Sequence, residues 1–408
     1  MRIALTSNGP GEFSGWVRPL VATLKRLAPQ TQIALFFVPD DYATGREDEV
    51  ARRLFPDVAV FAARDYLRFA LGRPLDGAPA GADAVLYLGG DLMHAARVRA
   101  RLGGALATYK FSSRRIRKSL VRAYAVDAKN AAALGRAGLE DDRIEIVGNL
   151  AVDGALAEAA GTFGGGERDR RIAPGGVLIL PGSRKYEIEH LVPFFVQVTL
   201  KLRAIAPDLP VAFAISPFTD AGELDRALQA GGHPRVWGAR GSVVDGPGGL
   251  WIQPAGDRAP IPVMRDAMRY AQSARMALTI PGTKCVELAA LGVPTMVCTP
   301  LNAPELAVIN GPLQYLDRVP FFMPLKRAIA LRVDKSFPLA AQPNMDAGEE
   351  LMPELRGTLM PGFVAQRAAA YAADDAARES ASQRLRAIYA DHVGAAERMA
   401  RSLLELAP

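Results

Sequence analysis

Three short segments combine glycine with a small hydroxyl residue, and each lies between an apolar run and a helix-like stretch. They are SNGPGEFSG (7–15), LPGSRKYEIE (180–189) and IPGTKCVELAALGVP (280–294). Where a helix begins, unpaired backbone N–H groups and the positive end of the helix dipole can hold an anion such as a phosphate. The same residue types also cap ordinary helices, so any one segment alone is weak evidence. Together they predict an anion-binding site.

The first segment offers its backbone more than its side chains. Gly9, Gly11 and Gly15 would let the chain approach a sugar or phosphate closely, and Glu12 and Ser14 would add polar contacts. A tight turn without any ligand is the alternative interpretation. These glycines are one residue away from the G-x-G-x-x-G fingerprint of dinucleotide-binding proteins, so an NAD enzyme is not favoured.

The elements that must position these segments follow from the alternation of apolar, β-branched runs with amphipathic stretches of helix length. In the first half of the chain the runs predict strands at 2–7, 32–38, 58–62, 84–89, 105–110, 122–127 and 144–148. In the second half they predict strands at 177–182, 210–216, 250–253, 276–280 and 294–299, with a helix at 186–206 and irregular structure at 231–262. Crossovers of this length imply parallel sheets covered by helices on both faces.

A stretch rich in glycine and charge separates the two alternating regions. We expect an N-terminal domain at 1–160, a linker at 161–176, a C-terminal domain at 177–361 and an alanine-rich helical tail at 362–408. The predicted fold class is therefore α/β, with two doubly wound domains facing a cleft. In such sheets ligands bind at the carboxyl ends of the strands.

The composition excludes several classes of protein. Half of the 408 residues are hydrophobic and 23% are charged, which is typical of a soluble globular protein. No apolar run approaches the roughly 20 residues that span a bilayer, and the first residues do not form a secretory signal, so we expect a cytoplasmic protein. Cys285 and Cys298 fit no metal or redox spacing, and the four histidines are scattered, so no metal site is expected.

Basic residues gather between Leu92 and Val126, a stretch that contains no acidic residue. It contains Arg97, Arg99, Arg101, Lys110, Arg114, Arg115, Arg117, Lys118 and Arg122. Such a block can hold phosphates, an anionic membrane surface or nucleic acid, or it can be an ordinary solvated face. Aromatic residues are not interleaved with the charges as a single-strand binder would require, so nucleic acid is not expected as a partner.

Four segments, in the same order and at plausible separations, resemble a known family. They are GEFSG (11–15), LPGSR with EIE (180–189), PGTKCVELAALGVP (281–294) and PNMDAGEELMPEL (343–355). They are similar to the signature segments of lipid A disaccharide synthase, an inverting glycosyltransferase with two Rossmann-like domains in the GT-B fold. The last two segments are the most specific. The family transfers a diacylated glucosamine from UDP to a lipid-linked glucosamine phosphate at the inner membrane, without a metal.

The resemblance implies a UDP-sugar donor bound by the C-terminal domain and a lipid or lipid-phosphate acceptor on the N-terminal side. It implies no cofactor, and a peripheral position on the inner face of the cytoplasmic membrane. The segment VFAARDYLRFALGRPL (60–75), which places apolar side chains among arginines, could provide that membrane surface or could be a half-buried ordinary helix. The family also implies a homodimer, in which the C-terminal tail is exchanged between protomers; alternatively the tail packs back on its own N-terminal domain.

The sequence departs from the family pattern where substrate would be recognised. Lys284 and Cys285 stand where the family has small residues, and Trp16 replaces an aspartate. The Gly-His-Pro segment of the family is replaced here by Gly148, Asn149 and Leu150. Of an Asp-Phe-Asn segment only Asp91 remains. The identity of the sugar, the acyl chains and the acceptor is therefore not predicted.

The donor-binding residues come from the two C-terminal segments. By resemblance Glu287 binds the ribose hydroxyls, while Gly282 and Thr283 are placed for the pyrophosphate. The alternative for Glu287 is an exposed first-turn acid that complements the helix dipole. Arg184 could hold two phosphate oxygens of the departing UDP, or could form a surface ion pair with Glu187. Ser183 could contribute to the same site, or could only cap a helix.

Asn344 and Glu350 belong to the strongest local match. A role in donor binding or in structure is expected for both, and the same segment contains Glu354.

Asp91 is the candidate catalytic residue. As a general base it would take the proton from the acceptor hydroxyl that attacks the anomeric carbon of the sugar. As an N-cap it would only begin the helix that follows. His94, one turn later, is interpreted as a packed or solvated helix residue rather than a second base.

Two other functions stay open. The first is a UDP-N-acetylglucosamine 2-epimerase-like enzyme, which would share the fold and the donor pocket but need no lipid acceptor. The second is a non-catalytic relative that binds a nucleotide sugar or a lipid phosphate.

Overall fold

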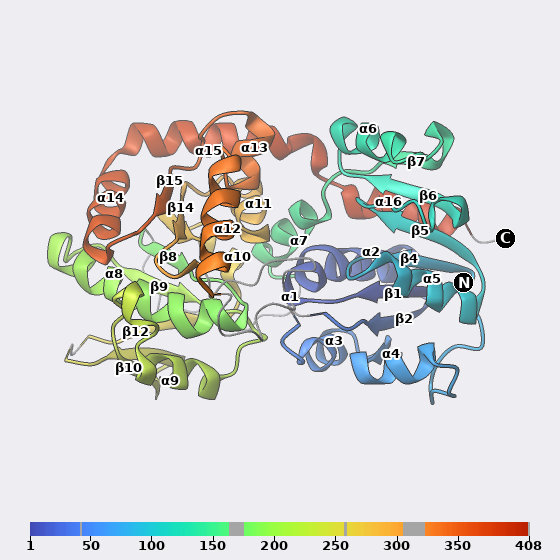
Figure 1. Cartoon of the computed structure of the whole chain (residues 1–408), viewed down its shortest axis with the longest axis horizontal. Coiled ribbons are helices and arrows are strands. Elements are labelled where there is room, and N and C mark those ends of the chain that lie inside the picture. The colour runs from blue at the N-terminus through green and yellow to red at the C-terminus, as the bar shows by residue number, and fades with distance from the viewer. Residues whose placement is uncertain (41–42, 163–174, 257–258, 305–322, 407–408) are drawn as a thin grey trace. The chain divides into compact units, whose positions relative to one another are not determined.

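The computed structural model describes residues 1–40, 43–162, 175–256, 259–304 and 323–406 (Figure 1). The chain divides into two compact units. Unit 1 consists of Met1–Gly164 and Tyr389–Pro408, and unit 2 of Gly165–Ile388. The predicted tail at 362–408 is thus divided between the units. Most of the predicted linker at 161–176 lies outside the described residues.

Unit 1 is built on a parallel sheet of seven strands in the order β3-β2-β1-β4-β5-β6-β7. The strands are β1 (Arg2–Ser7), β2 (Gln32–Phe37), β3 (Ala59–Phe61), β4 (Ala84–Tyr87), β5 (Ala105–Tyr109), β6 (Leu120–Ala125) and β7 (Ile144–Ile146). Each overlaps a strand expected from the apolar runs. The central strands are buried over nearly their whole length, because helices cover both faces of the sheet.

The helices of unit 1 come from both ends of the chain. They are α1 (Pro10–Glu12), η1 (Phe13–Val17), α2 (Arg18–Leu27), α3 (Glu47–Leu54), α4 (Ala63–Ala70), α5 (Leu92–Leu102), η2 (Arg117–Ser119), α6 (Ala128–Arg136), η3 (Asp141–Arg143), α7 (Leu150–Ala159), η9 (Ala390–His392) and α16 (Ala395–Glu405). Helix α16 packs against α2 and α7. The Asp153 carboxylate accepts the N–H groups of Gly394 (2.8 Å) and Ala396 (2.6 Å) at its start, which fixes the end of the chain to this unit.

The glycine-rich opening segment is helical, which corrects the expectation of an open loop. The chain turns only at Asn8 and Gly9, and then α1, the π-helical turn η1 and α2 follow without a break, so Gly11 and Gly15 are helix residues. Pro19, near the start of α2, has no N–H to offer the carbonyl four residues earlier, and this explains the widened turn.

Unit 2 contains an eight-stranded mixed sheet in the order β10-β11-β12-β9-β8-β13-β14-β15. The strands are β8 (Val177–Leu180), β9 (Val211–Ala214), β10 (Gly241–Gly246), β11 (Gly249–Pro254), β12 (Ile261–Met264), β13 (Met276–Thr279), β14 (Thr295–Pro300) and β15 (Glu354–Gly357). The pairs β10–β11 and β11–β12 are antiparallel, and the rest are parallel. Within 231–262 the strand expected at 250–253 is confirmed as β11, but the irregular structure expected around it is wrong, since the stretch also contains β10 and the start of β12.

The helices of unit 2 are η4 (Glu187–Leu191), α8 (Val192–Ile205), α9 (Ala221–Ala230), η5 (Pro234–Val236), α10 (Ala267–Ala271), α11 (Thr283–Ala290), α12 (Met323–Ser336), α13 (Gln342–Ala347), α14 (Pro361–Ala373) and α15 (Asp375–Tyr389). The segment η4 is again a π-helical turn, and Pro193 follows it as Pro19 follows η1. Both units thus open with a strand, a short turn, a π-helical turn and a proline-led helix.

In each sheet the strand order reverses beside the first strand. In unit 1 the chain goes from β1 to β2 on one side and returns to β4 on the other, and in unit 2 β8 lies between β9 and β13. Loops diverge at the carboxyl ends of the strands at such a switch point, which leaves room for a ligand.

Candidate functional site

Two of the three glycine-containing segments come together at the switch point of unit 2. Strands β8 and β13 are parallel neighbours, and Leu180 pairs with Thr279. The Thr279 hydroxyl donates to the Leu180 carbonyl oxygen at 3.1 Å, so the two strands end side by side. The turns that follow, at 181–184 and 281–283, therefore leave the same edge of the sheet.

The turn after β8 is closed by a carboxylate of its own chain. Glu187, which is 5% exposed, accepts the backbone N–H groups of Ser183 (2.7 Å) and Arg184 (2.8 Å) through Oε2. Gly182 has a φ of +107°, and a Cβ atom there would lie 2.2 Å from the same oxygen, so only glycine fits. The amides expected to hold a phosphate are thus occupied by Glu187.

Arg184 is the cation of this turn. Its side chain is half exposed, and its Nη1 lies 3.7 Å from Glu187 Oε1, which is an ion pair of loose geometry. Ser183 donates its backbone N–H to Glu187, and the N-cap of the π-helical turn η4 (Glu187–Leu191) is Tyr186 rather than Ser183.

Glu187 makes the stability of unit 2 depend on pH. Burial raises the pKa of this carboxyl above its usual value of 4.5, although Arg184 and the two amides act in the opposite direction. A raised folded-state pKa means that the contribution of Glu187 is complete below pH 4.5 and is lost as the pH rises through the higher value. We expect Glu187→Gln, which keeps an acceptor for both amides, to give a flatter dependence of the unfolding midpoint on pH above 4.5.

The matched variant Glu187→Ala separates charge from capping. It leaves both amides without their acceptor and should lower stability at every pH, by about 1–2 kcal/mol. Urea unfolding at a series of pH values measures both variants. A Glu187→Gln profile that runs parallel to that of the wild type would contradict the assignment.

The turn after β13 leaves its backbone accessible. Gly282 is exposed, its φ of 161° is extended backbone, and no atom lies within 4 Å of the position a Cβ would take. Helix α11 begins at the next residue, Thr283, which is partly exposed. This helix start therefore presents open backbone, in contrast to the closed turn after β8.

Glu287 lies one turn into α11 and is almost completely buried. It is 3% exposed, so the alternative of an exposed first-turn acid is wrong. Its Oε2 accepts a hydrogen bond from Lys284 Nζ at 2.5 Å, and the lysine side chain is 37% exposed. Lys284 is one of the departures from the family pattern, and here it supplies the cation that accompanies the buried carboxylate.

Helix α11 is fixed at both ends by the surrounding chain. At its start Cys285, fully buried, donates through Sγ to the Ile280 carbonyl oxygen at 3.5 Å. At its end Gly292 has a φ of +67°, and Arg386 Nε donates to the Leu291 carbonyl oxygen at 3.2 Å. The segment 281–294 is thus a braced helix whose open end carries Gly282 and Thr283.

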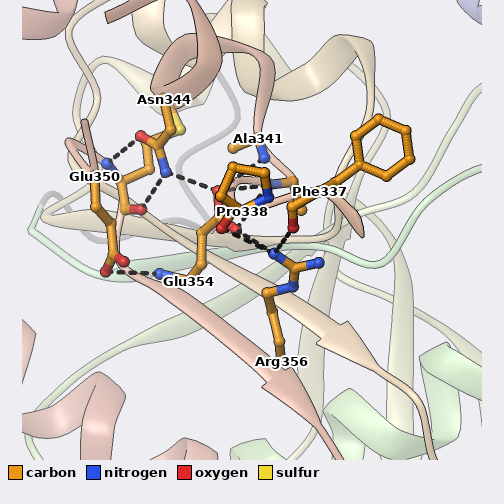
Figure 2. A network of polar contacts seen from close by, with 9 residues as sticks. Phe337, Pro338, Ala341, Asn344, Glu350, Glu354 and Arg356 are labelled. Carbon is orange, nitrogen blue, oxygen red and sulfur yellow. Dashed lines mark hydrogen bonds and ion pairs between the residues drawn. The ribbon is translucent and has the colours of Figure 1, made fainter. Parts of the chain in front are cut away.

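Asn344 holds a network of hydrogen bonds within unit 2 (Figure 2). Its Nδ2 donates to Met352 O and Glu354 Oε1, both at 2.8 Å, and its Oδ1 accepts the N–H groups of Leu351 (2.9 Å) and Met352 (2.8 Å). Both amide protons and both acceptor positions are therefore used within the chain. Asn344 supports the structure here, and its side chain has no capacity left for a donor substrate.

Glu354 and Glu350 complete this network. Glu354 accepts the N–H groups of Ala340 and Ala341 at the start of α13, and Arg356 Nη1 donates to the carbonyl oxygens of Phe337 and Pro338 (Figure 2). Exposed Glu350 accepts the N–H of Glu354 at 3.2 Å. Because α13 packs against α11, the network positions the helix that bears Glu287.

The switch point of unit 1 gathers the other candidate residues. Asp91 follows β4, is exposed, and accepts the Met93 N–H through Oδ1 at 2.8 Å, so it is the N-cap of α5. A Cβ atom on Gly89 would lie 2.2 Å from Asn8 Oδ1 and 3.0 Å from Glu12 Cγ. The end of β4 thus lies against the turn after β1, and Asp91 and Glu12 share one edge of the sheet.

The remaining residues of the first segment have different environments. Gly9 precedes α1 with a φ of −105°, Gly11 and Ser14 are partly exposed, and Gly15 is buried in η1. Close approach of backbone does occur here, but to the chain itself: a Cβ on Gly154 of α7 would lie 3.3 Å from the Ser14 carbonyl oxygen.

Three polar residues near Asp91 were not predicted from the sequence. Asn8 Nδ2 donates to Asp40 Oδ2 at 2.9 Å, and Tyr66 O–H meets His94 Nδ1 at 2.7 Å. Asp40 follows β2, which pairs with β1. A carboxylate shortly after a strand end could therefore have indicated from the sequence that Asp40 lies near the turn after β1. Tyr66 lies within a helix, where its spacing indicated only core packing.

The segment 60–75 contributes more to the core than expected. Phe61, Tyr66 and Phe69 are buried, whereas Leu67 (47%) and Leu71 (80%) are exposed. Arginines at 64, 68 and 73 are exposed as well, so a small apolar surface with a basic edge remains. No helix among the described residues has the length and apolar character needed to cross a membrane. Within the same residues no group of three or more His, Cys, Asp or Glu side chains could hold a metal.

Comparison with known proteins identifies solved structures that share this architecture. No protein-family model matches the sequence, and a search of curated proteins finds no match. Among solved structures, the chain is similar to MnaA of S. aureus in complex with UDP (13% identity, TM-score 0.57, covering 99% of this chain and 97% of that one). It is also similar to UDP-GlcNAc 2-epimerase of Neisseria meningitidis bound to UDP-GlcNAc (9% identity, TM-score 0.55, covering 99% and 100%). The fold is GT-B-like.

A third structure, of a putative UDP-N-acetylglucosamine 2-epimerase from Listeria monocytogenes, agrees (12% identity, TM-score 0.53, covering 98% and 94%). The predicted GT-B-like α/β fold with two doubly wound units is thereby confirmed. At identities this low the likeness extends to the fold alone.

Proposed function

We propose that this chain is an inverting glycosyltransferase that moves an acylated, glucosamine-type sugar from UDP to a lipid-linked acceptor. The observation that carries the proposal is the position of the four family-like segments. Two follow adjacent strands at the switch point of unit 2, one opens unit 1 at its own switch point, and one braces α11. Residues far apart in sequence are thus gathered where GT-B-like sheets offer room for a ligand.

The proposed donor site consists of Gly282, Thr283, Lys284, Glu287 and Arg184. The open start of α11 would receive the diphosphate, with the Lys284 and Arg184 side chains as its cations. Glu287 would accept the ribose hydroxyls, and Lys284 would swing from the carboxylate toward the phosphates as UDP enters. Asn344, Glu350 and Ser183 then have supporting roles, because their polar groups serve the chain itself.

On the acceptor side Asp91 would be the general base, with Glu12 and Ser14 nearby as polar contacts. A base must reach the hydroxyl that attacks the anomeric carbon, and an exposed carboxylate at a strand end can do so. The proposal needs no metal, since Arg184, Lys284 and the α11 dipole supply positive charge for the leaving UDP.

The acceptor implies a membrane surface. The exposed Leu67 and Leu71, with the arginines of α4 and α5, would contact anionic lipid headgroups on the inner face of the cytoplasmic membrane. A homodimer completes the proposal by resemblance to the family.

Saturating UDP is expected to protect the chain against heat. A ligand at about 100 times its Kd adds about 2.7 kcal/mol to the stability of the folded state. Glu287→Ala should remove most of this protection, measured for each protein as the shift that UDP produces relative to its own unliganded midpoint. Thermal shift with UDP, and with CDP as a control for the base, measures both effects. Equal protection of the variant and the wild type would refute the role of Glu287.

A UDP-N-acetylglucosamine 2-epimerase is the second candidate, and it is favoured by the solved structures from Neisseria meningitidis and Listeria monocytogenes, which bear that name. The two activities differ in what they need. A transferase releases UDP only when the lipid acceptor is supplied, whereas an epimerase changes the configuration at C2 of UDP-GlcNAc alone. NMR of UDP-GlcNAc incubated with the protein, beside a UDP-release assay with and without a lipid-linked glucosamine phosphate, separates them. UDP binding without either activity would indicate a non-catalytic relative.

A further inference from the structure

His94 lies in the first turn of α5, beside the proposed base. Its backbone N–H donates to the Asp91 carbonyl oxygen at 2.9 Å, and residues three apart on a helix share a face. The histidine is partly exposed and Asp91 is exposed. The two side chains therefore border the same part of the surface at the end of β4.

A buried tyrosine holds the imidazole in place. Tyr66, on α4, is 0% exposed, and its hydroxyl lies 2.7 Å from His94 Nδ1. The two rings are perpendicular, with their centroids 5.1 Å apart. A short hydrogen bond to a fully buried phenol fixes the orientation of the imidazole, with Nδ1 directed at Tyr66.

Burial sets the direction of the hydrogen bond between Tyr66 and His94. Tyr66 is 0% exposed, and among the described residues His94 Nδ1 is the hydrogen-bond partner of its hydroxyl, so a phenolic proton turned away from Nδ1 would be buried without an acceptor. The single phenolic proton is then directed at His94, whose Nδ1 must accept it. A neutral imidazole that accepts at Nδ1 carries its own proton on Nε2.

The surrounding charges keep both groups in these forms. Burial raises the pKa of Tyr66, so it stays a phenol. Burial also lowers the pKa of His94, in the same direction as Arg97, while the carboxylates of Asp91 and Asp40 act against this. Because burial is the largest of these effects, the imidazole is neutral at neutral pH.

One donor and one acceptor are left at this surface. Among the described residues His94 makes its side-chain hydrogen bond with Tyr66 alone, through Nδ1, so Nε2–H is available. Asp91 uses Oδ1 for the Met93 N–H, so within the same residues Oδ2 is available. A sugar hydroxyl both donates and accepts, and a diol or amino alcohol can engage the two groups together.

We propose that His94 is a substrate-positioning hydrogen-bond donor, held as the Nε2–H tautomer by Tyr66, and that with Asp91 it recognises the hydroxyl groups of the acceptor sugar. This inference rests on the proposed function, since it names the sugar as the ligand of this edge. His94 is then not a second base, because Nε2, the nitrogen not bonded to Tyr66, already bears the proton. Tyr66 is a positioning residue, which acts on the substrate only through His94.

The tautomer can be observed directly by NMR of the full chain labelled with ¹⁵N-histidine. There are only four histidines, so single replacements assign every signal. In the wild type we expect His94 to carry its proton on Nε2, and Tyr66→Phe to produce a mixture of both tautomers. His392, whose Nδ1 accepts the Asn149 N–H at 3.1 Å, is the internal control and should not change. A wild-type His94 protonated on Nδ1 would overturn the proposal.

Binding is tested with glucosamine 1-phosphate, the soluble head of the proposed acceptor, and needs no UDP donor. The probe should shift the His94 Nε2 signal and leave that of His392 in place. His94→Ala should weaken its binding about 3- to 10-fold, as expected for one neutral hydrogen bond, and His94→Gln, which keeps an N–H donor, should restore most of it. No shift at His94, or equal affinity of the alanine variant, refutes the inference. Binding with these properties but without any UDP release would refute the proposed transferase activity alone.

Discussion

Asp91→Asn is expected to lower the rate of acceptor-dependent UDP release by about 10²- to 10⁴-fold, the range attributed to a positioned general base. At this position the substitution separates proton transfer from helix capping. Asp91 accepts the Met93 N–H as the N-cap of α5, and asparagine caps helices as well as aspartate does. The variant therefore keeps the start of the helix and loses only the ability to take a proton.

Asp91→Ala provides the matched control. It removes both the base and the cap, and should cost about 1 kcal/mol of stability in addition to the loss of rate. Initial rates with a lipid-linked glucosamine phosphate, together with urea unfolding, distinguish the two variants. If Asp91→Asn retains wild-type turnover, the carboxylate is a cap only and the base must be sought elsewhere at the edge, for instance at Glu12 or Asp40.

The parallel framework could be predicted because buried strands carry their own signal. Runs such as RIALTS (2–7) and VLIL (177–180) are apolar on both faces, as strands covered on two sides must be. Strands β10 and β15 lack that signal: GSVVDG is only partly buried and bounded by glycine, and ELRG is mostly polar. Strand β12 (IPVM) is apolar and buried, but it is only four residues long and contains a proline. The pairing of β15 with β14 joins segments distant in sequence, which composition cannot show.

The positions of the glycine-containing turns could be predicted from the sequence, but the hydrogen-bonding state of their polar groups could not. Glycine and hydroxyl residues after a strand indicated helix starts, and three such starts are present. What the pattern could not show is which internal groups already use the polar atoms. Glu187 accepts the backbone N–H groups of one turn, and Lys284 donates to Glu287. Asn344 uses both amide protons and its amide oxygen in hydrogen bonds within the chain. Each of these depends on a side-chain conformation, whereas the pattern specifies only the order of residues.

Glu158→Ala is expected to have the largest effect on the stability of unit 1, about 3–5 kcal/mol. Glu158 on α7 forms an ion pair with Arg18 at the start of α2, and the two residues are only 8% and 9% exposed. Removing Glu158 leaves the Arg18 charge buried without its ion-pair partner, and the loss of that partner in a desolvated position is costly. Urea unfolding followed by the fluorescence of Trp16 reports on this unit, since the other two tryptophans, at 237 and 251, belong to unit 2.

An exposed pair in the same unit gives the comparison. Arg26 and Glu397 lie 2.8 Å apart with side chains 60% and 39% exposed, and Arg26→Ala should cost no more than about 1 kcal/mol. A loss of less than 1 kcal/mol in Glu158→Ala would mean that the Arg18 guanidinium finds water or another acceptor once its partner is gone.

The double variant Arg18→Met/Glu158→Leu tests whether the pair stabilises the fold or only has to be kept intact. Buried ion pairs can often be exchanged for apolar side chains of similar volume without loss, so the double variant should recover most of the stability lost by Glu158→Ala. The location of the pair gives the result a functional meaning. Arg18 follows the π-helical turn, and α7 packs closely against that turn, because a Cβ on Gly154 would lie only 3.3 Å from the Ser14 carbonyl oxygen. If the apolar double variant is stable but the segment carrying Glu12 and Ser14 shifts, the ion pair determines the position of α2 and the turn rather than the stability of the unit.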